Sequence, residues 1–411
     1  MRHDKIDLFW NDFPGMSDAD SPPTRPFLAI YVAWHPKFAS GKEIALSLFQ
    51  HYRRDLYQNV AGGAGLPVMY RSAPPPGSAV PIDIPFDDAE TCAVVLLIDE
   101  HWARDAEWVA WAQHLSDEAD RAGLRTLIFP VAIDESALSS GAIREQAVRW
   151  DRWSSERTDA KLRKLCTALS YQFCRMLRRF LEHLERPALP EDDLLNFLKR
   201  VEVFLSHSKH DPDGEQIALE FRKFVHDADY DDFFDVHNIP IGLKFDRVLL
   251  EKVKASAVIA IHTDSYSTRE WCRREMIQAK LSNSPLVVAN CIKDADERGF
   301  PYMANVPIVR MDPEKRNRID VVVGRLMDEV LKDFLWRCRV KMFAATAVRV
   351  SFIPRPPELI VLTTLRGRKP PTDTVVYPDP PIGAEELSLF AKAAPRIKLL
   401  SMTEWLAGAK P

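Results

Sequence analysis

The sequence predicts an α/β protein with flavodoxin-like, three-layer parallel sheets. The first observation is a set of short apolar runs without alternation, such as CAVVLLID at 92–99 and ASAVIAI at 255–261, which is typical of strands buried on both faces. The second is that helical patterns separate these runs, which implies right-handed crossovers between parallel strands. The third is that this order occurs twice in 411 residues, a length too great for one core.

The first α/β unit is expected at 26–185, after a polar, proline-bearing N-terminal arm at 1–25. Its predicted elements are a strand at 27–34, a helix at about 41–57, strands at 66–72 and 92–99, a helix at about 104–122, a strand at 124–133 and a closing helix at 159–184. A proline-rich loop lies at 72–85, and RPALPEDD at 186–193 is the expected linker to the next unit.

The second unit is expected at 198–340, and its first helix has a clear start. Asp211 is a suitable N-cap, and Pro212 follows at the first helical position. A core-facing apolar stripe then continues along the helix at Ile217, Phe221, Phe224 and Val225. Further strands are predicted at 285–292 and 306–311, before a long closing helix at 316–339.

The tail at 345–411 is predicted to be a small C-terminal α/β segment. ELIVLTTL at 358–365 is expected to be a strand, followed by a second strand and a helix within 375–394 and a last strand from 397. A segment of this size is too short to stand alone as a three-layer domain, so we expect it to pack against one of the other units.

The composition limits the classes of partner. The net charge of −4 argues against a broad electrostatic interaction with nucleic acid or an acidic membrane, and the apolar runs are far shorter than the roughly 20 residues that span a bilayer. Six cysteines without a C-x-x-C pair predict reduced, buried thiols in a cytoplasmic protein. No histidine and cysteine set has zinc-ligand spacing, so we expect neither a metal nor a bound cofactor.

Polar side chains gather where the strands of the second unit end, which is where ligands bind in open α/β sheets. Ser206, His207 and Ser208 follow the first strand, 239–245 follows the second, and Ser265 and Tyr266 follow the third. Ser267 and Glu270 have capping-box spacing, which predicts the start of the next helix. Trp271 and Glu275, four residues apart, then share one face of that helix.

Three motifs occur in order within this unit: FLSHS at 204–208, NIPIG at 238–242 and WCRRE at 271–275. Together they resemble a bacterial TIR (Toll/interleukin-1 receptor) domain of the NAD-cleaving type. The resemblance implies that Glu275 is the catalytic residue and that NAD is the substrate. A carboxylate beside the ribose would stabilise the positive charge that builds on the anomeric carbon as the nicotinamide bond breaks.

The resemblance also implies a substrate site and a mode of assembly. The implied site consists of Ser206, His207, Ser208, Ile241, Gly242, Lys244, Phe245, Ser265, Tyr266 and Trp271. Gly242 is expected at a positive φ, and the loop that carries it is expected to contact a neighbouring molecule, so that the protein self-associates. Plainer interpretations remain open: core packing for Trp271, loop capping for the two serines, and a surface ion pair for Glu275.

The first unit differs from the second at the implied catalytic position. Aligning Trp108 with Trp271 places Ala112 where Glu275 stands. We therefore interpret the first unit as a degenerate, non-catalytic TIR-like domain, with another flavodoxin-like domain as the alternative. Such a unit is expected to hold an activating nucleotide or to dock a partner protein.

The leading functional hypothesis is an NAD glycohydrolase or cyclase, an NAD+ nucleosidase that acts in antiphage defence by signalling or by depleting NAD. A non-catalytic TIR scaffold that mediates protein–protein assembly is the second hypothesis. A nucleoside deoxyribosyltransferase-like enzyme is the third, and the NIPIGLKF loop at 238–245 argues against it.

Overall fold

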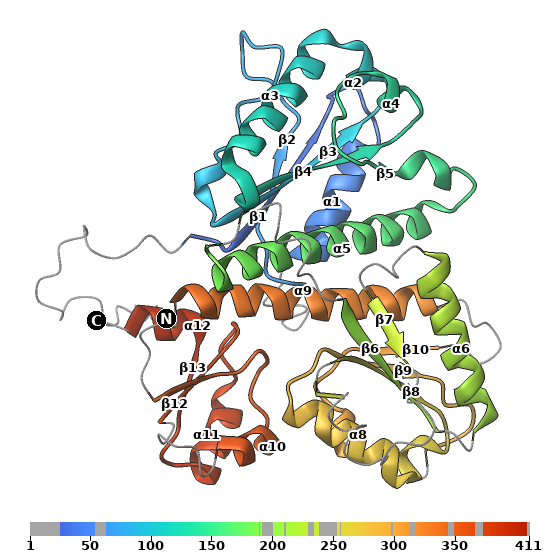
Figure 1. Cartoon of the computed structure of the whole chain (residues 1–411), viewed down its shortest axis with the longest axis vertical. Coiled ribbons are helices and arrows are strands. Elements are labelled where there is room, and N and C mark those ends of the chain that lie inside the picture. The colour runs from blue at the N-terminus through green and yellow to red at the C-terminus, as the bar shows by residue number, and fades with distance from the viewer. Residues whose placement is uncertain are drawn as a thin grey trace, which may run out of the picture.

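Three parallel sheets form the framework of the molecule (Figure 1). The computed structural model describes residues 25–53, 63–188, 190, 200–208, 211–228, 234–237, 253–254, 256–296, 299–311, 318–343, 349–365 and 373–408. Each pair of neighbouring strands in the three sheets is parallel. The predicted α/β class with parallel sheets is therefore confirmed.

The first sheet has the strand order of a flavodoxin-like fold, 2-1-3-4-5 along the chain. In sheet order its strands are β2 (Val68–Arg71), β1 (Leu28–Trp34), β3 (Thr91–Ile98), β4 (Thr126–Ala132) and β5 (Val148–Arg149). Its helices are α1 (Gly41–Tyr52), α2 (Glu100–Arg104), α3 (Ala106–Ala122), α4 (Ser136–Ser139) and α5 (Thr158–Glu185). All residues of β1 and β3 are buried, as their unbroken apolar runs predict.

The helix expected at 104–122 is interrupted after its first residues. Asp105 lies between α2 and α3, with extended backbone angles. Its carboxylate accepts hydrogen bonds from the backbone N–H groups of Glu107 at 3.0 Å and Trp108 at 3.4 Å. An aspartate that caps a helix N-terminus in this way starts a new helix.

The second sheet repeats the strand order of the first. In sheet order its strands are β7 (Phe234–His237), β6 (Val201–Ser206), β8 (Ala257–His262), β9 (Leu286–Asn290) and β10 (Ile308–Arg310). Its described helices are α6 (Pro212–Asp227), α8 (Glu270–Leu281) and α9 (Ile319–Phe343). Asp211 caps α6 as expected, because its carboxylate accepts a hydrogen bond from the Asp213 N–H at 3.1 Å.

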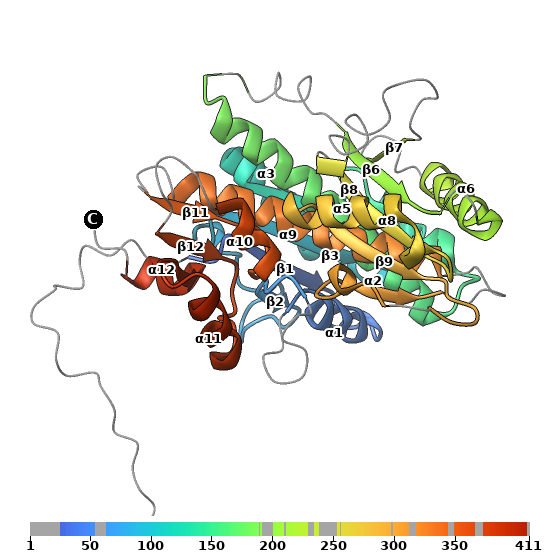
Figure 2. The same cartoon turned by 90° about the horizontal axis from the view of Figure 1, so that it is seen from below.

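Both sheets lie between helical layers, and a continuous apolar core joins them. One face of the first sheet packs with α3, and its other face packs with α1 and α5. One face of the second sheet packs with α8, and its other face packs with α6 and α9. The core on the α5 and α9 side is one continuous cluster of buried residues from Phe27 to Cys338. The two long helices therefore form the shared central layer of the molecule (Figures 1 and 2).

Helices α5 and α9 pack side by side and in the same direction, with early residues beside early residues. The Arg163 guanidinium lies 3.7 Å from Asp320, and Gly324 lies close to Thr167. Further along, the Cys338 thiol lies 3.6 Å from the Leu177 carbonyl oxygen. Equivalent closing helices of the two sheets therefore contact one another.

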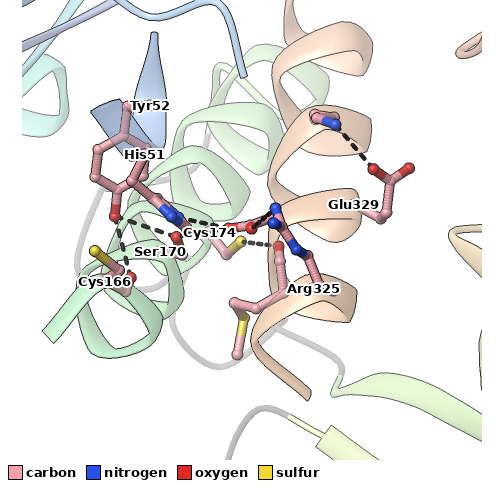
Figure 3. Close-up of polar contacts among 10 residues, drawn as sticks. His51, Tyr52, Cys166, Ser170, Cys174, Arg325 and Glu329 are labelled. Carbon is pink, nitrogen blue, oxygen red and sulfur yellow. Dashed lines mark hydrogen bonds and ion pairs between the residues drawn. The ribbon is translucent and has the colours of Figure 1, made fainter. Parts of the chain in front are cut away.

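A polar network lies within this contact and links it to α1 (Figure 3). The Asp328 carboxylate on α9 lies 3.0 Å from His51 Nε2 and accepts a hydrogen bond from the Ser170 hydroxyl at 3.2 Å. The Tyr52 hydroxyl lies 3.1 Å from Ser170 Oγ and donates to the Cys166 carbonyl oxygen. Burial acts to raise the pKa of Asp328, but the nearby positive charges and the hydrogen bond from His51 leave that pKa below its usual value.

The third sheet is small and packs beside α9. Its strands are β11 (Val350–Phe352), β12 (Thr374–Tyr377) and β13 (Lys398–Ser401), and its helices are α10 (Leu359–Leu362), α11 (Ala384–Ala393) and α12 (Met402–Gly408). The strand expected at 358–365 is wrong, since this run forms α10 followed by a 3₁₀ turn. Short apolar runs fit a buried helix as well as a strand, so periodicity alone could not separate the two.

Among the described residues, no helix is long and apolar enough to cross a membrane.

Candidate functional site

The second sheet has a topological switch point between β6 and β8. The chain leaves β6 for β7 on one side and then returns to β8 on the other side, so the connections diverge there. In open parallel sheets, ligands bind beyond the carboxyl ends of the strands at this point. Ser206 is the last residue of β6, and Tyr266 lies in the turn that follows β8.

Three polar side chains from three elements meet at the switch point. The Ser206 hydroxyl donates a hydrogen bond to Glu275 Oε2 on α8. The Tyr266 hydroxyl lies 2.5 Å from the same serine oxygen, so it completes a chain from Tyr266 through Ser206 to Glu275. Ser206 and Tyr266 have no exposed surface, and Glu275 retains 7%. The predicted proximity of Ser206, Tyr266 and Glu275 is therefore present in the structure.

The electrostatic surroundings of this trio are those of a desolvated carboxylate site. Burial raises the pKa of Tyr266 well above its usual value, and the neighbouring Cys272 and Glu275 act in the same direction. The phenol therefore stays protonated and acts as a hydrogen-bond donor. A ligand hydroxyl or amine that reached Glu275 would meet an acceptor already oriented by Ser206.

Other predicted site residues surround the trio. Ser208 is 1% exposed, and its hydroxyl has no hydrogen-bond partner among the described residues. His207 turns back to its own strand, with Nδ1 3.1 Å from the Leu205 carbonyl oxygen. The Ser265 hydroxyl donates to Asp211 Oδ2 at 3.3 Å. Ser208 thus lies beside the switch point with no hydroxyl partner among the described residues, while His207 and Ser265 have protein partners.

The structure describes Trp271 but not the predicted site residues of the loop. Trp271 is half-buried against the core on the α8 side, and the Arg274 guanidinium lies over its ring at 4.3 Å. This position agrees with the packing interpretation and does not test ligand contact. Four predicted site residues lie outside the described residues: Ile241, Gly242, Lys244 and Phe245.

A second polar group at the same edge was not predicted from the sequence. His262 Nε2 lies 3.1 Å from Ser267 Oγ and 3.0 Å from Asp296 Oδ2. The Ser267 hydroxyl also donates to Asp296 at 3.0 Å. Burial lowers the pKa of His262, although Asp296 acts in the opposite direction. Serine and aspartate share one ring nitrogen here, whereas a catalytic triad needs them on opposite nitrogens, so this is not a hydrolase triad.

This group corrects the predicted capping box. Helix α8 begins at Glu270, and Arg269 occupies the N-cap position without a side-chain cap. Ser267 instead lies in the 3₁₀ turn Tyr266–Thr268, where its hydroxyl serves Asp296. The spacing alone could not reveal this, because the competing acceptor is 29 residues away along the chain.

The loops at this edge are predominantly acidic in the parts that the structure describes. Their charged residues are Asp211, Asp264, Asp294, Asp296, Arg269 and Lys293. The ammonium of Lys293 is 2.5 Å from the Asp213 carboxylate, so that cation is already neutralised.

The equivalent edge of the first sheet carries indole rings together with titratable side chains. His35 and Asp99 follow β1 and β3, and His35 Nε2 lies 3.6 Å from Asp105 Oδ2. Three indole rings, Trp102, Trp108 and Trp111, contact one another with ring centroids 4.7 to 5.9 Å apart. Ala112, aligned with Glu275, is fully buried beside them on α3. The alignment thus pairs a carboxylate in one unit with an alanine in the other, while polar side chains are present at both edges.

Comparisons with known proteins give no family assignment. No family model matches the chain, and no curated protein matches it. Two similar solved structures are the C-terminal domain of glucosamine-fructose-6-phosphate aminotransferase from Francisella tularensis and a protein from Silicibacter pomeroyi described provisionally as a phosphosugar isomerase. The alignments cover 77% and 75% of this chain and 84% and 86% of those chains, at 10% identity and a TM-score of 0.19 in each case.

These findings overturn the TIR assignment. Neither structure is described as a TIR domain or as an NAD-cleaving enzyme, and no family model supports the three motifs. The NAD+ nucleosidase activity, the antiphage role and the two alternative functions lose their basis with it. The motifs locate strand ends and a helix that many doubly wound folds share, and a fold does not specify a reaction. At a TM-score of 0.19, the activities of the two neighbours are not transferred to this chain either.

Proposed function

We propose that the carboxyl edge of the second sheet binds a small, neutral or cationic ligand rich in hydroxyl or amino groups, such as a sugar, an amino sugar or a nucleoside. The observation that carries this proposal is the hydrogen-bonded chain from Tyr266 through Ser206 to Glu275 at the switch point. A buried carboxylate oriented by a serine is an acceptor for ligand hydroxyl or ammonium groups. The Ser208 hydroxyl, which has no partner in the part of the chain that the structure describes, would supply a further ligand group at the same edge.

The acidic loops support the choice of ligand charge. Among the described charges of this edge, the four aspartates outnumber the two cations, Arg269 and Lys293, so this part of the edge would disfavour a phosphate group and favour an ammonium group. We therefore propose that unphosphorylated ligands bind in preference to their phosphorylated counterparts. The proposed compartment is the cytoplasm, which agrees with six free, buried cysteine thiols.

The test is a comparison of matched ligand pairs. Glucose, glucosamine and adenosine would each be compared with the corresponding phosphate by thermal shift and by isothermal titration calorimetry. Saturation at 100 times Kd stabilises the folded protein by about 2.7 kcal/mol, which a thermal shift resolves. We expect at least one unphosphorylated compound to bind, and its phosphate to bind at least tenfold more weakly.

The variant Glu275→Ala tests the site, and Glu270→Ala is its control. Both residues lie on α8, but the control side chain is exposed. We expect Glu275→Ala to abolish binding while circular dichroism shows a folded protein, and Glu270→Ala to bind normally. No binding by any compound, a preference for phosphates, or normal binding by folded Glu275→Ala would each contradict the proposal.

A further inference from the structure

Helix α8 carries the proposed ligand acceptor near its middle and is held at its other end by the third-sheet segment, 349–408. The Lys280 ammonium, 6% exposed, donates to Glu358 Oε1 at 2.6 Å. It also donates to the Ala304 carbonyl oxygen at 2.6 Å. Glu358 directly precedes α10, and α10 packs against α8 (Figure 2). The contact is thus a buried charge pair between two segments 78 residues apart in the chain.

A second cation of the third-sheet segment reaches the same end of α8. Arg355 donates from Nη1 to the Asn283 carbonyl oxygen at 2.6 Å, just beyond the last turn of the helix. Its Nη2 lies 3.7 Å from Glu329 on α9. Arg355 therefore links α8, α9 and the third-sheet segment.

The ion pair between Lys280 and Glu358 is buried, so water does not readily take the place of either partner. Burial lowers the pKa of Lys280, while the hydrogen bond and the charge of Glu358 act in the opposite direction and favour the ammonium form. Removing one partner of a buried ion pair is strongly destabilising, because the other charge then remains buried without compensation. The end of α8 is consequently fixed by Glu358 and not by surface contacts alone.

The Lys280–Glu358 ion pair lies close to Glu275, the proposed ligand acceptor, and one rigid helix connects them. Glu275 and Lys280 are five residues apart on one continuous helix, which is about 7.5 Å along its axis. Ser206 and Tyr266 hold the Glu275 carboxylate from the sheet side, and Glu358 and Arg355 hold the helix end. A displacement of the helix end would move the carboxylate relative to Ser206.

We propose that the third-sheet segment is a positioning element for the ligand site, coupled to Glu275 through the Lys280–Glu358 pair. This inference rests on the proposed function. Its consequence is reciprocal: ligand bound at Glu275 strengthens docking of the third-sheet segment, and loosening of that segment weakens ligand binding by the same factor. Glu358, Lys280 and Arg355 are positioning residues, because their contacts hold the end of α8 and would act on ligand only through Glu275.

The test uses the full chain with Glu358→Gln, and Arg349→Gln serves as the control. Arg349 forms an ion pair with Asp373 at 2.6 Å inside the third-sheet segment, and both side chains are about half exposed. Hydrogen exchange followed by mass spectrometry needs no ligand. We expect Glu358→Gln to raise the exchange rate of amides in 263–277 at least fivefold, while Arg349→Gln leaves those rates unchanged. Unchanged exchange in folded Glu358→Gln would overturn the proposal.

Ligand affinity separates this inference from the proposed function. If wild-type protein binds one of the matched compounds, Glu358→Gln is expected to raise Kd about tenfold, within the usual range of coupling between sites. A Kd within twofold of the wild-type value would contradict the proposed coupling between Glu358 and Glu275. It would not contradict the proposed ligand site. If no compound binds, the proposed function fails, while the exchange measurement still decides whether Glu358 positions α8. Should Glu358→Gln not fold, Lys280→Met removes the buried charge instead and is expected to give the same exchange result.

Discussion

The close approach of α5 and α9 can be tested by adding one methyl group at Gly324. A Cβ at this position would lie 2.8 Å from Thr167 Oγ1, about 0.6 Å short of an ordinary contact. Alanine in place of glycine inside a helix stabilises it by about 0.5–1 kcal/mol. Overpacking costs about 1–3 kcal/mol. The steric term is the larger of the two, so we expect Gly324→Ala to lower the free energy of unfolding by about 0.5–2 kcal/mol.

A double-mutant cycle isolates the contact. In a Thr167→Ala background the obstructing oxygen is gone, so Gly324→Ala should stabilise the protein by about 0.5–1 kcal/mol. Urea denaturation followed by circular dichroism measures all four proteins. Gly299→Ala, at a non-helical position with open space around it, controls for an added methyl group that meets no neighbouring atom. Equal effects of Gly324→Ala in both backgrounds would refute the close packing of the two helices.

Two further predictions concern the edge of the second sheet. Ser206→Ala removes a partner of the buried Glu275 carboxylate, so it should lower the free energy of unfolding by about 1–3 kcal/mol in urea titrations. The exposed Ser139→Ala should change it by less than about 0.5 kcal/mol, and similar values for both would contradict the burial argument. Because burial lowers the pKa of His262, the unfolded state binds more protons below about pH 6.5, so stability should fall as pH drops from 7 to 5. His262→Gln should reduce that slope, and an unchanged slope would show that another group, such as His35, is responsible.

The parallel sheets and part of the site could be predicted because they depend on local patterns. The unbroken apolar runs at 92–98 and 257–261 specify buried strands, and the residue after such a strand must lie at the carboxyl edge. Ser206 and Glu275 could therefore be assigned to one edge from sequence alone. Their direct hydrogen bond adds only the orientation of the two side chains.

The rest depends on contacts that the sequence does not display. The His262–Asp296 contact joins two loops 34 residues apart, and it decides where Ser267 points. The run at 358–365 became α10 because it packs against α8, which its own periodicity does not reveal. The assignment to an NAD-cleaving family failed for a related reason. The short motifs indicated where polar side chains lie close together. They did not indicate which ligand those side chains contact, and the reaction depends on that ligand.

The parallel contact of α5 with α9 joins two sheets of the same strand order within one chain, an arrangement that a homodimer would build from two chains. In a true homodimer both copies carry every substitution, so a carboxylate lost from one site is lost from its mate. Here the two halves have separate sequences. Ala112 is buried beside indole rings in the first half, while Glu275 lies beside Ser206 in the second. A single chain of this kind can therefore carry different side chains at the two equivalent sheet edges.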